Sequence, residues 1–115
     1  MSVTIYGIKN CDTMKKAFAW LDAHGVEYEF HDYKKVGVPA GKLKAWAKQA
    51  GWKTLANTRG STWRKIPEGK RANLNEAKMF ALLEANTSAI RRPIVEAGGK
   101  LLAGFDPEAF SKALR

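Results

Sequence analysis

The sequence predicts an α/β fold in the order β-α-β, helical insertion, β-β-α, with a four-stranded mixed sheet. Near the N-terminus, two alternating β-rich segments flank a helical pattern within about 30 residues, as in a right-handed βαβ unit with parallel strands. Near the C-terminus, two short β-rich segments flank a glycine pair and precede an amphipathic helix. Residues 39–86 show no clear strand pattern, which predicts the helical insertion.

The N-terminal unit begins with residues 3–6, which alternate and end at Gly7. The apolar residues that follow recur with helical spacing as far as His24 and Gly25, a basic last turn and a terminating glycine. These apolar residues are Met14, Ala17, Phe18 and Leu21. In residues 26–32, apolar and polar side chains alternate, which predicts a half-exposed strand.

The insertion contains two further helix patterns. Pro39 is expected to open a helix that Gly51 closes, and Asn73 is expected to cap a later one. Apolar residues with helical spacing support both, namely Leu43, Trp46, Ala47 and Ala50 in the first and Ala77, Phe80 and Leu83 in the second. Residues 57–65 are polar and basic, which predicts short helical turns and loop around a packed Trp63.

The C-terminal part returns to strand patterns. Residues 90–95 and 100–103 are β-rich and flank Gly98 and Gly99, so we expect an antiparallel hairpin. Asp106 and Pro107 are typical of an N-cap and a first helical position. They predict a last helix with the apolar residues Ala109, Phe110, Ala113 and Leu114.

The composition indicates one soluble globular domain spanning residues 1–115, with the insertion at about 39–86. Hydrophobic residues make up 45% and charged residues 27%, which excludes disordered and membrane-spanning classes. Neither an export signal nor an apolar stretch of about 20 residues is found. We therefore expect a cytoplasmic monomer that does not bind a membrane.

The formal net charge of +9 predicts attraction to anions, such as glutathione, an oxyanion, nucleic acid or an acidic protein partner. The 20 lysines and arginines are spread along the whole chain, which favours a solvated exterior over a binding face. Residues 59–71 combine basic side chains with Trp63 but match no recognised nucleic-acid motif. Nucleic-acid binding is the weaker hypothesis, and it predicts a steep loss of affinity with salt.

Cys11 is the only cysteine, so any disulfide that it forms must join another molecule. It lies in the loop between the first predicted strand and helix, where helix N–H groups and dipole favour a thiolate. The nearby lysines act in the same direction and Asp12 opposes them; these lysines are Lys9, Lys15 and Lys16. The sequence therefore predicts a thiol pKa below its ordinary value.

For an arbitrary chain, a lone cysteine is more often a buried apolar residue than a nucleophile. Here the polar neighbours Asn10 and Thr13, at the carboxyl end of a strand, favour an exposed site and are candidate ligand-binding residues. Met14 stands where a dithiol centre would have its second cysteine. A monothiol needs an external thiol to resolve its mixed disulfide, and glutathione is the abundant cytosolic one.

Arg92 and Pro93 precede the third predicted strand. A proline at the first residue of a strand is ordinary, and only about one X-Pro bond in twenty is cis, so spacing alone favours a trans bond. The two histidines, His24 and His31, are distant from each other and from Cys11. We therefore expect neither a metal site nor a bound cofactor.

Four segments together resemble the arsenate reductase (ArsC) family, and within it the YffB and Spx-like branch: residues 6–17, 57–64, 92–95 and 102–105. The resemblance covers essentially the whole chain. It implies a thioredoxin-like fold with a helical insertion, and it implies that Cys11 is the nucleophile. It further implies that Arg59 and Arg92 bind anions near the thiol and that Pro93 follows a cis bond.

Three departures from the family pattern narrow the function. A further family arginine is replaced by Ala103 and Gly104, and a histidine four residues before the cysteine is replaced by Gly7. Both losses count against arsenate as substrate, because removing a donor from an oxyanion site costs several kcal/mol of transition-state stabilisation. Met14 excludes the two-cysteine switch that many Spx regulators use.

The expected function is that of a glutathione-dependent monothiol reductase acting on an unidentified disulfide or other electrophile. Cys11 and Arg92 are the expected catalytic residues, with glutathione as co-substrate. Arg59 and Arg92 would hold the glutathione carboxylates, and the backbone beside Pro93 would pair with its peptide groups. The alternatives are arsenate reduction with a reduced arginine set, and an Spx-like regulator that binds RNA polymerase.

Overall fold

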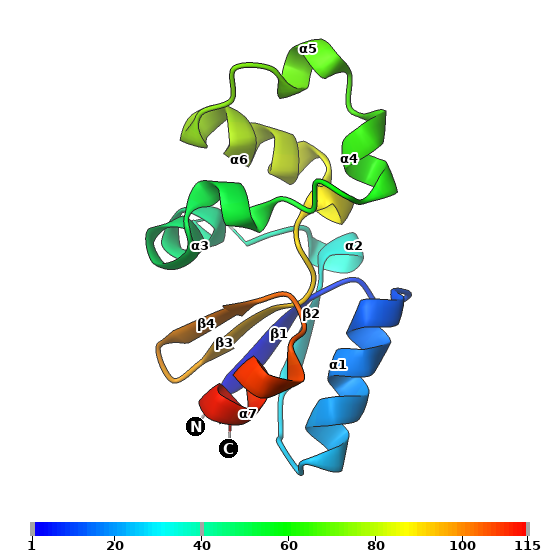
Figure 1. Ribbon diagram of the computed structural model, residues 1–115, viewed down its shortest axis with the longest axis vertical. Coiled ribbons are helices and arrows are strands. Elements are labelled where there is room, and N and C mark those ends of the chain that lie inside the picture. Colours follow the sequence, from blue (N-terminus) through cyan, green and yellow to red (C-terminus); the bar gives the residue numbers. More distant parts are fainter. Residues whose placement is uncertain (1, 40, 115) are drawn as a thin grey trace.

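The computed structural model describes residues 2–39 and 41–114 and contains a four-stranded sheet in the order β2-β1-β3-β4 (Figure 1). The central strand β1 (Val3–Gly7) pairs in parallel with β2 (Glu29–Asp32) and antiparallel with β3 (Ile94–Ala97). β4 (Lys100–Ala103) completes the predicted antiparallel hairpin with β3. The sheet is therefore mixed, as expected.

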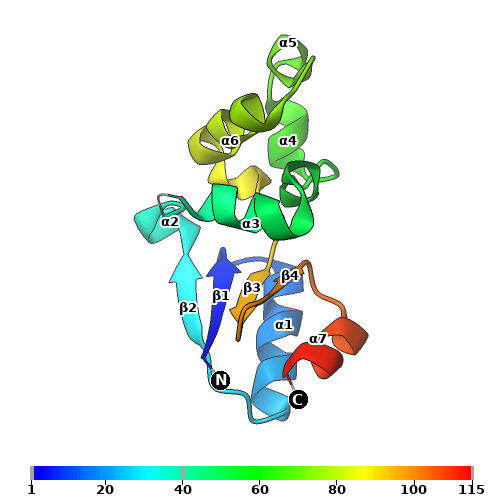
Figure 2. The same cartoon turned by 90° about the vertical axis from the view of Figure 1, so that its left-hand side faces the viewer.

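Two helices cover one face of this sheet, α1 (Asp12–Ala23) and α7 (Pro107–Leu114) (Figures 1 and 2). Alternate strand residues and the buried sides of both helices form one apolar cluster. Its fully buried members are Ile5, Met14, Ala17, Leu21, Val95 and Phe110. The Asp106 carboxylate accepts a hydrogen bond from the Glu108 N–H at 3.1 Å, which confirms the predicted cap.

The segment between β2 and β3 is helical and gathers beyond the end of the sheet where β1 stops (Figure 2). Its elements are α2 (Tyr33–Val36), α3 (Lys42–Ala50), η1 (Trp52–Leu55), α4 (Ser61–Lys65), α5 (Glu68–Arg71), α6 (Glu76–Ala85) and η2 (Thr87–Ala89). All of them except α5 contribute buried residues to a second apolar cluster, which also contains Tyr6 of β1, Ile94 of β3 and Ile8, the residue after β1. This order confirms the thioredoxin-like α/β fold with a helical insertion.

A hydrogen-bonded cluster around Glu96 fixes the insertion to the sheet. The Tyr6 hydroxyl donates to Glu96 Oε1 at 2.6 Å, and Lys42 Nζ lies 3.0 Å from both carboxylate oxygens. Trp46 Nε1 donates to Oε2 at 2.9 Å. Because these partners come from β1, β3 and α3, the cluster sets how the first long helix of the insertion sits on the strands.

Two predicted strands are shorter than expected. β2 covers only residues 29–32 instead of 26–32, because only these pair with β1. The third strand begins at Ile94 instead of residue 90, because its pairing with β1 and β4 starts only at Ile94. Ile90 instead forms an isolated antiparallel bridge with Ala56 in the insertion.

The caps within the insertion also differ from expectation. Asn75, not Asn73, caps α6, since its side chain accepts from the Lys78 N–H at 2.9 Å, whereas Asn73 has a φ of 53°. α3 begins at Lys42 instead of next to Pro39. Trp63 is buried, as predicted. Within residues 2–39 and 41–114, no helix combines the length and apolar character needed to cross a membrane.

Candidate active site

Cys11 is the N-cap residue of α1 and directly follows the loop from β1. Its backbone is extended, with φ −146° and ψ 131°, and its carbonyl accepts from the Lys15 N–H at 2.9 Å. The side chain is partly exposed and packs at the margin of the cluster beneath α1. The thiol is thus neither fully buried nor fully solvated, which suits a reactive cysteine.

The pKa of the Cys11 thiol lies below its ordinary value. Burial raises this pKa, but the Met14 N–H, the Arg92 charge, the Thr13 N–H and an Arg92 hydrogen bond together outweigh burial. The predicted direction is therefore confirmed. The leading charge is that of Arg92, not those of the lysines that flank Cys11 in sequence, to which the sequence prediction assigned this effect.

Arg92 is held beside the thiol by its own loop. Its Nη1 donates to the Ser88 carbonyl at 2.9 Å, while its Nε is buried with no hydrogen-bond partner among the described residues. The Arg92–Pro93 peptide bond is cis, which confirms that expectation, and Pro93 is fully buried. The Pro93 carbonyl accepts from Gly104 N–H at 2.8 Å.

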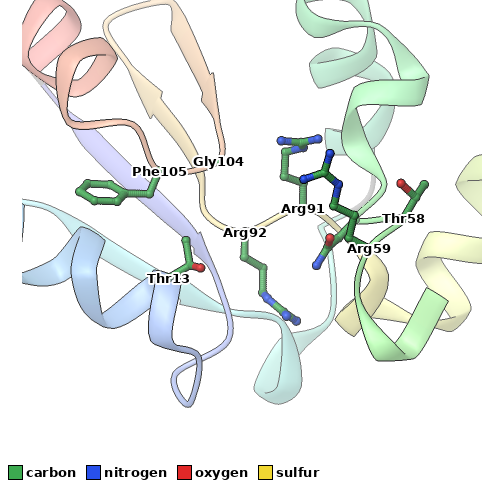
Figure 3. Close-up of a pocket in the computed structure, with 8 residues that line it drawn as sticks. Thr13, Thr58, Arg59, Arg91, Arg92, Gly104 and Phe105 are labelled. Carbon is green, nitrogen blue, oxygen red and sulfur yellow. The ribbon is translucent and has the colours of Figure 1, made fainter. Parts of the chain in front are cut away.

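A cavity of about 550 Å³ opens at the first turn of α1, and we call it the arginine cavity (Figure 3). Four separate segments line it: Thr13 from α1, residues 57–59 after η1, residues 91–92 before β3, and residues 104–105 after β4. The parallel strand end, the insertion and the last hairpin therefore meet here, as expected for a site in an open α/β sheet.

Three arginines give the arginine cavity its character. Figure 3 shows the guanidinium groups of Arg59 and Arg91 converging, whereas Arg92 extends in another direction. The Arg91 Nε donates to the Thr54 carbonyl at 2.9 Å. Within the described part of the chain, neither salt bridge involves an arginine. Converging guanidinium groups without a carboxylate favour the binding of an anion.

Backbone pairing fixes the two arginine-bearing segments relative to each other. The Asn57 N–H donates to the Ala89 carbonyl at 2.8 Å, and the Arg91 N–H donates to the Leu55 carbonyl at 2.7 Å. The loop tightens further at Gly60, where a Cβ would lie 2.8 Å from Nδ2 of Asn57. Arg59 and Arg91 are thus presented by a paired scaffold instead of by free loops.

The expected site residues occupy different places. Thr13, Arg59 and Arg92 line the arginine cavity, and Pro93 lies buried beside it. Asn10 instead lines a second cavity, which shares no lining residue with the arginine cavity. Among the described residues, no group of three or more His, Cys, Asp or Glu side chains is placed to hold a metal.

The sequence prediction missed Arg91, Asn57 and the backbone at Gly104 as parts of the cavity. Arg91 stands next to Arg92 in sequence, and a pair of arginines was the available signal, but paired arginines are usually solvated. Asn57 lay in a segment that carried the family resemblance. Neither the arginine pair nor the family resemblance indicates that the side chains of Arg91 and Asn57 face a cavity.

The two family positions that are changed here have structural correlates. At Gly7, a Cβ would lie 2.5 Å from the Met14 Sδ and 2.7 Å from its Cε, so Met14 fills the space that a side chain would need. Gly104 has a φ of +85°, and a Cβ there would lie 3.4 Å from Arg91 Nη1. Gly104 thus lines the arginine cavity without a side chain that would press on Arg91, whereas Gly7 leaves room for the buried Met14.

Comparison with known proteins identifies relatives along nearly the whole chain. The model of the ArsC family matches residues 6–113. An uncharacterized protein of Haemophilus influenzae is 40% identical over 111 residues, covering 96% of this chain and 97% of its own. A solved structure of a YffB protein is 49% identical with a TM-score of 0.95, covering 99% and 100% of the two chains. The global transcriptional regulator Spx of Listeria monocytogenes is 25% identical over 114 residues, which cover 97% of this chain and 86% of Spx.

Proposed function

This chain belongs to the ArsC family, and we propose that it is a glutathione-dependent thiol reductase with Cys11 as its single nucleophile. One observation carries the proposal: a thiol with a lowered pKa lies beside Arg92, and Arg92 lines a cavity whose other arginines, Arg59 and Arg91, form no salt bridge among the described residues. Cys11 itself is not among the residues that line this cavity. Such a site can stabilise a thiolate and bind an anionic thiol next to it.

The reaction proceeds in two exchanges. The Cys11 thiolate attacks the glutathione sulfur of a disulfide between glutathione and a second thiol, so that a Cys11–glutathione disulfide forms and the second thiol leaves as a thiolate. A second glutathione thiolate then attacks the glutathione sulfur of the enzyme disulfide. Oxidised glutathione leaves and the Cys11 thiolate is restored. The net reaction exchanges one disulfide for another: the incoming glutathione sulfur is oxidised as it enters oxidised glutathione, and the second thiol is released in its reduced form.

The arginine cavity offers partners for each kind of group on glutathione. Arg59 and Arg91 converge, so we assign one glutathione carboxylate to this pair, whereas the sequence prediction paired Arg59 with Arg92. Arg92 acts at the sulfur end, where it stabilises the Cys11 thiolate. No backbone hydrogen bond among the described residues uses the Arg92 N–H or carbonyl, which leaves both for a peptide group of glutathione.

The decisive test measures the glutathione-dependent turnover of a glutathione mixed disulfide. Glutathione reductase is coupled to the reaction to report the oxidised glutathione that forms. Cys11→Ser is expected to abolish turnover. Arg59→Met is expected to lower kcat/KM for glutathione by about 10- to 100-fold, since a hydrogen bond to a charged group contributes about 1.5–3 kcal/mol. Arg64→Met is the matched control, because Arg64 is exposed on α4 and does not line the cavity. Undiminished turnover by Cys11→Ser would overturn the proposal.

The similarity to Spx favours a second candidate, a regulator that binds RNA polymerase. That function requires binding without turnover, and Cys11→Ser protein should then retain its partner in a pull-down with purified RNA polymerase. Arsenate reduction is tested in parallel with glutathione and glutaredoxin present. Arsenate-dependent consumption of NADPH that Cys11→Ser abolishes would support arsenate reduction. The resemblance counts against it, because Gly7 and the Ala103–Gly104 pair stand where arsenate reductases of this type carry a histidine and an arginine.

A further inference from the structure

A second cavity, of about 480 Å³, lies between α1 and β2 and shares no lining residue with the arginine cavity. We call it the aromatic cavity. Its lining joins three aromatic side chains, Phe18, Tyr28 and Phe30, to three lysines, Lys9, Lys15 and Lys35. The reductase chemistry described above assigns no role to this cavity.

The aromatic wall is ordered by ring contacts. Phe18 stacks on Tyr28 with ring centroids 5.6 Å apart, and its ring meets that of Phe30 edge-on at 5.1 Å. All three side chains are only partly buried. β2 is an edge strand, so no neighbouring strand covers this side of the sheet. The wall therefore presents planar apolar surface that can stack on an aromatic ring.

The rim of the aromatic cavity is positively charged. None of its three lysines forms a salt bridge within the described residues. The cavity holds one carboxylate, that of Asp32, whose Oδ1 already accepts from the Lys34 N–H at 2.9 Å. An anionic group on a bound ring would thus meet an excess of cations at this rim.

Cys11 lines neither cavity, but it stands in the chain between residues that line the one and the other. Asn10, immediately before it, lines the aromatic cavity, and Thr13, two residues after it, lines the arginine cavity. In thiol–disulfide exchange the attacking, central and leaving sulfurs approach a straight line. The two halves of a substrate disulfide consequently point in different directions from the attacked sulfur and need separate binding regions.

We propose that the aromatic cavity binds the second half of the substrate disulfide, an aromatic thiol that carries an anionic group. The inference rests on the proposed function and names its substrate class. Glutathione occupies the arginine cavity. The Cys11 thiolate forms a bond to the glutathione sulfur while the S–S bond of the substrate breaks. The electron pair of that bond leaves with the aromatic thiolate, which departs readily because aromatic thiols have a low pKa. The second glutathione then releases oxidised glutathione as above.

The kinetic test compares two mixed disulfides of glutathione, one with 2-nitro-5-thiobenzoate and one with 2-mercaptoethanol. Each kcat/KM is divided by the rate constant of the uncatalysed reaction with glutathione, which removes the intrinsic difference in leaving group. We expect the corrected ratio to favour the aromatic anion by about tenfold or more, equivalent to about 1.4 kcal/mol. Lys35→Glu is expected to reduce this preference severalfold. The matched control is Lys34→Glu, which changes an exposed neighbour outside the cavity lining.

A binding measurement gives a readout that does not depend on turnover. Isotope-labelled Cys11→Ser protein is titrated separately with 3-nitrobenzoate and with S-methylglutathione. The proposal predicts that nitrobenzoate shifts the resonances of Phe18, Tyr28 and Phe30, whereas S-methylglutathione shifts those around Arg59 and Arg91.

The outcomes separate this inference from the function on which it rests. Turnover with no corrected preference, together with no nitrobenzoate shift at the three rings, would overturn the aromatic cavity as a binding site and leave the reductase function intact. Nitrobenzoate binding at the rings without any glutathione-dependent turnover would overturn the reductase function and support the cavity as an aromatic-anion site. A corrected preference together with nitrobenzoate shifts at the rings, both weakened in Lys35→Glu, supports the full proposal.

Discussion

Arg92 places its guanidinium group beside the thiol of Cys11 and lowers the pKa of that thiol. The two residues stand near opposite ends of the chain. Antiparallel pairing of β1 with β3 brings them together, because Cys11 follows the end of β1 and Arg92 precedes the start of β3. The reactivity of the thiol consequently depends on the sheet register as well as on the helix that Cys11 caps.

Replacing Arg92 should raise the pKa of Cys11. Arg92→Met removes both the charge and the hydrogen bond that stabilise the thiolate, while Arg92→Lys keeps the charge. The measurement is the rate of iodoacetamide alkylation as a function of pH, which reports the thiolate fraction. We expect the midpoint to move upward in Arg92→Met and less in Arg92→Lys. An unchanged midpoint in Arg92→Met would show that the helix N–H groups alone lower the pKa.

The same pKa shift predicts a pH dependence of stability. Because the thiol pKa is lower in the folded than in the unfolded protein, ionised Cys11 stabilises the fold above the unfolded-state pKa. This stabilisation is lost as the pH falls through the folded-state pKa. Urea unfolding of the wild type and Cys11→Ser across the neutral to alkaline range tests it. The difference in unfolding free energy should grow in favour of the wild type as the pH rises, and a constant difference would contradict the prediction.

Arg91 should contribute to anion binding as strongly as Arg59. Arg91→Met is expected to weaken binding of S-methylglutathione to Cys11→Ser protein by about 10- to 100-fold, because one charged donor is lost from a converging pair. Calorimetric titration measures the affinity. Thermal unfolding of the same variant monitors the loss of its hydrogen bond to Thr54. An affinity of Arg91→Met equal to that of the Arg64→Met control would show that Arg91 does not contribute to binding S-methylglutathione.

The parts of the fold that the sequence predicts well have a strong local signal. β1 and α1 are predicted because the apolar residues alternate with a period of two and then change to helical spacing. The β3–β4 turn is predicted by Gly98 and Gly99, which both have positive φ in the structure. In the insertion the local signals compete. Both Asn73 and Asn75 are able to cap a helix, and only the backbone conformation that the surrounding chain imposes selects Asn75.

The candidate site is only partly predictable for a related reason. The thiolate-stabilising position of Cys11 follows from local chain order, but its pairing with Arg92 requires the β1–β3 register. Arg91 faces the cavity because residues 55 to 57 pair with residues 89 to 91, and no local pattern indicates this pairing. The aromatic cavity likewise combines one face of α1 with an edge strand, each of which alone has the pattern of ordinary core packing.

A side chain at Gly7 should destabilise the protein through Met14. Met14 is fully buried, so it has little room to move away from a Cβ that would lie 2.5 Å from its sulfur. Gly7→Ala is expected to cost about 1–3 kcal/mol, the usual range for overpacking a core. A double-mutant cycle with Met14→Ala, measured by urea unfolding, should show a coupling of about 0.5–3 kcal/mol. Additive effects of the two substitutions would contradict the proposed contact.

Glu96 should hold the insertion on the sheet in a pH-dependent manner. Burial raises the pKa of Glu96, but hydrogen bonds from Tyr6, Trp46 and Lys42 outweigh burial and lower the pKa overall. The stabilisation is therefore present above the unfolded-state pKa and is lost as the pH falls through the lower folded-state pKa. Glu96→Gln is expected to lower the free energy of unfolding by about 1–3 kcal/mol at neutral pH, because three donors then face a neutral amide instead of a charged carboxylate. The difference from the wild type should shrink in acid.

Glu108→Gln provides the matched control for Glu96→Gln. Glu108 also pairs with a lysine, Lys112 at 3.5 Å, but both side chains are 79% exposed, and such pairs contribute about 0.5 kcal/mol or less. Urea unfolding followed by tryptophan fluorescence compares the two variants directly, because Trp46 belongs to the Glu96 cluster. Equal destabilisation by both variants would show that the Glu96 cluster does not fix the insertion, and that apolar packing between α3 and the sheet is sufficient.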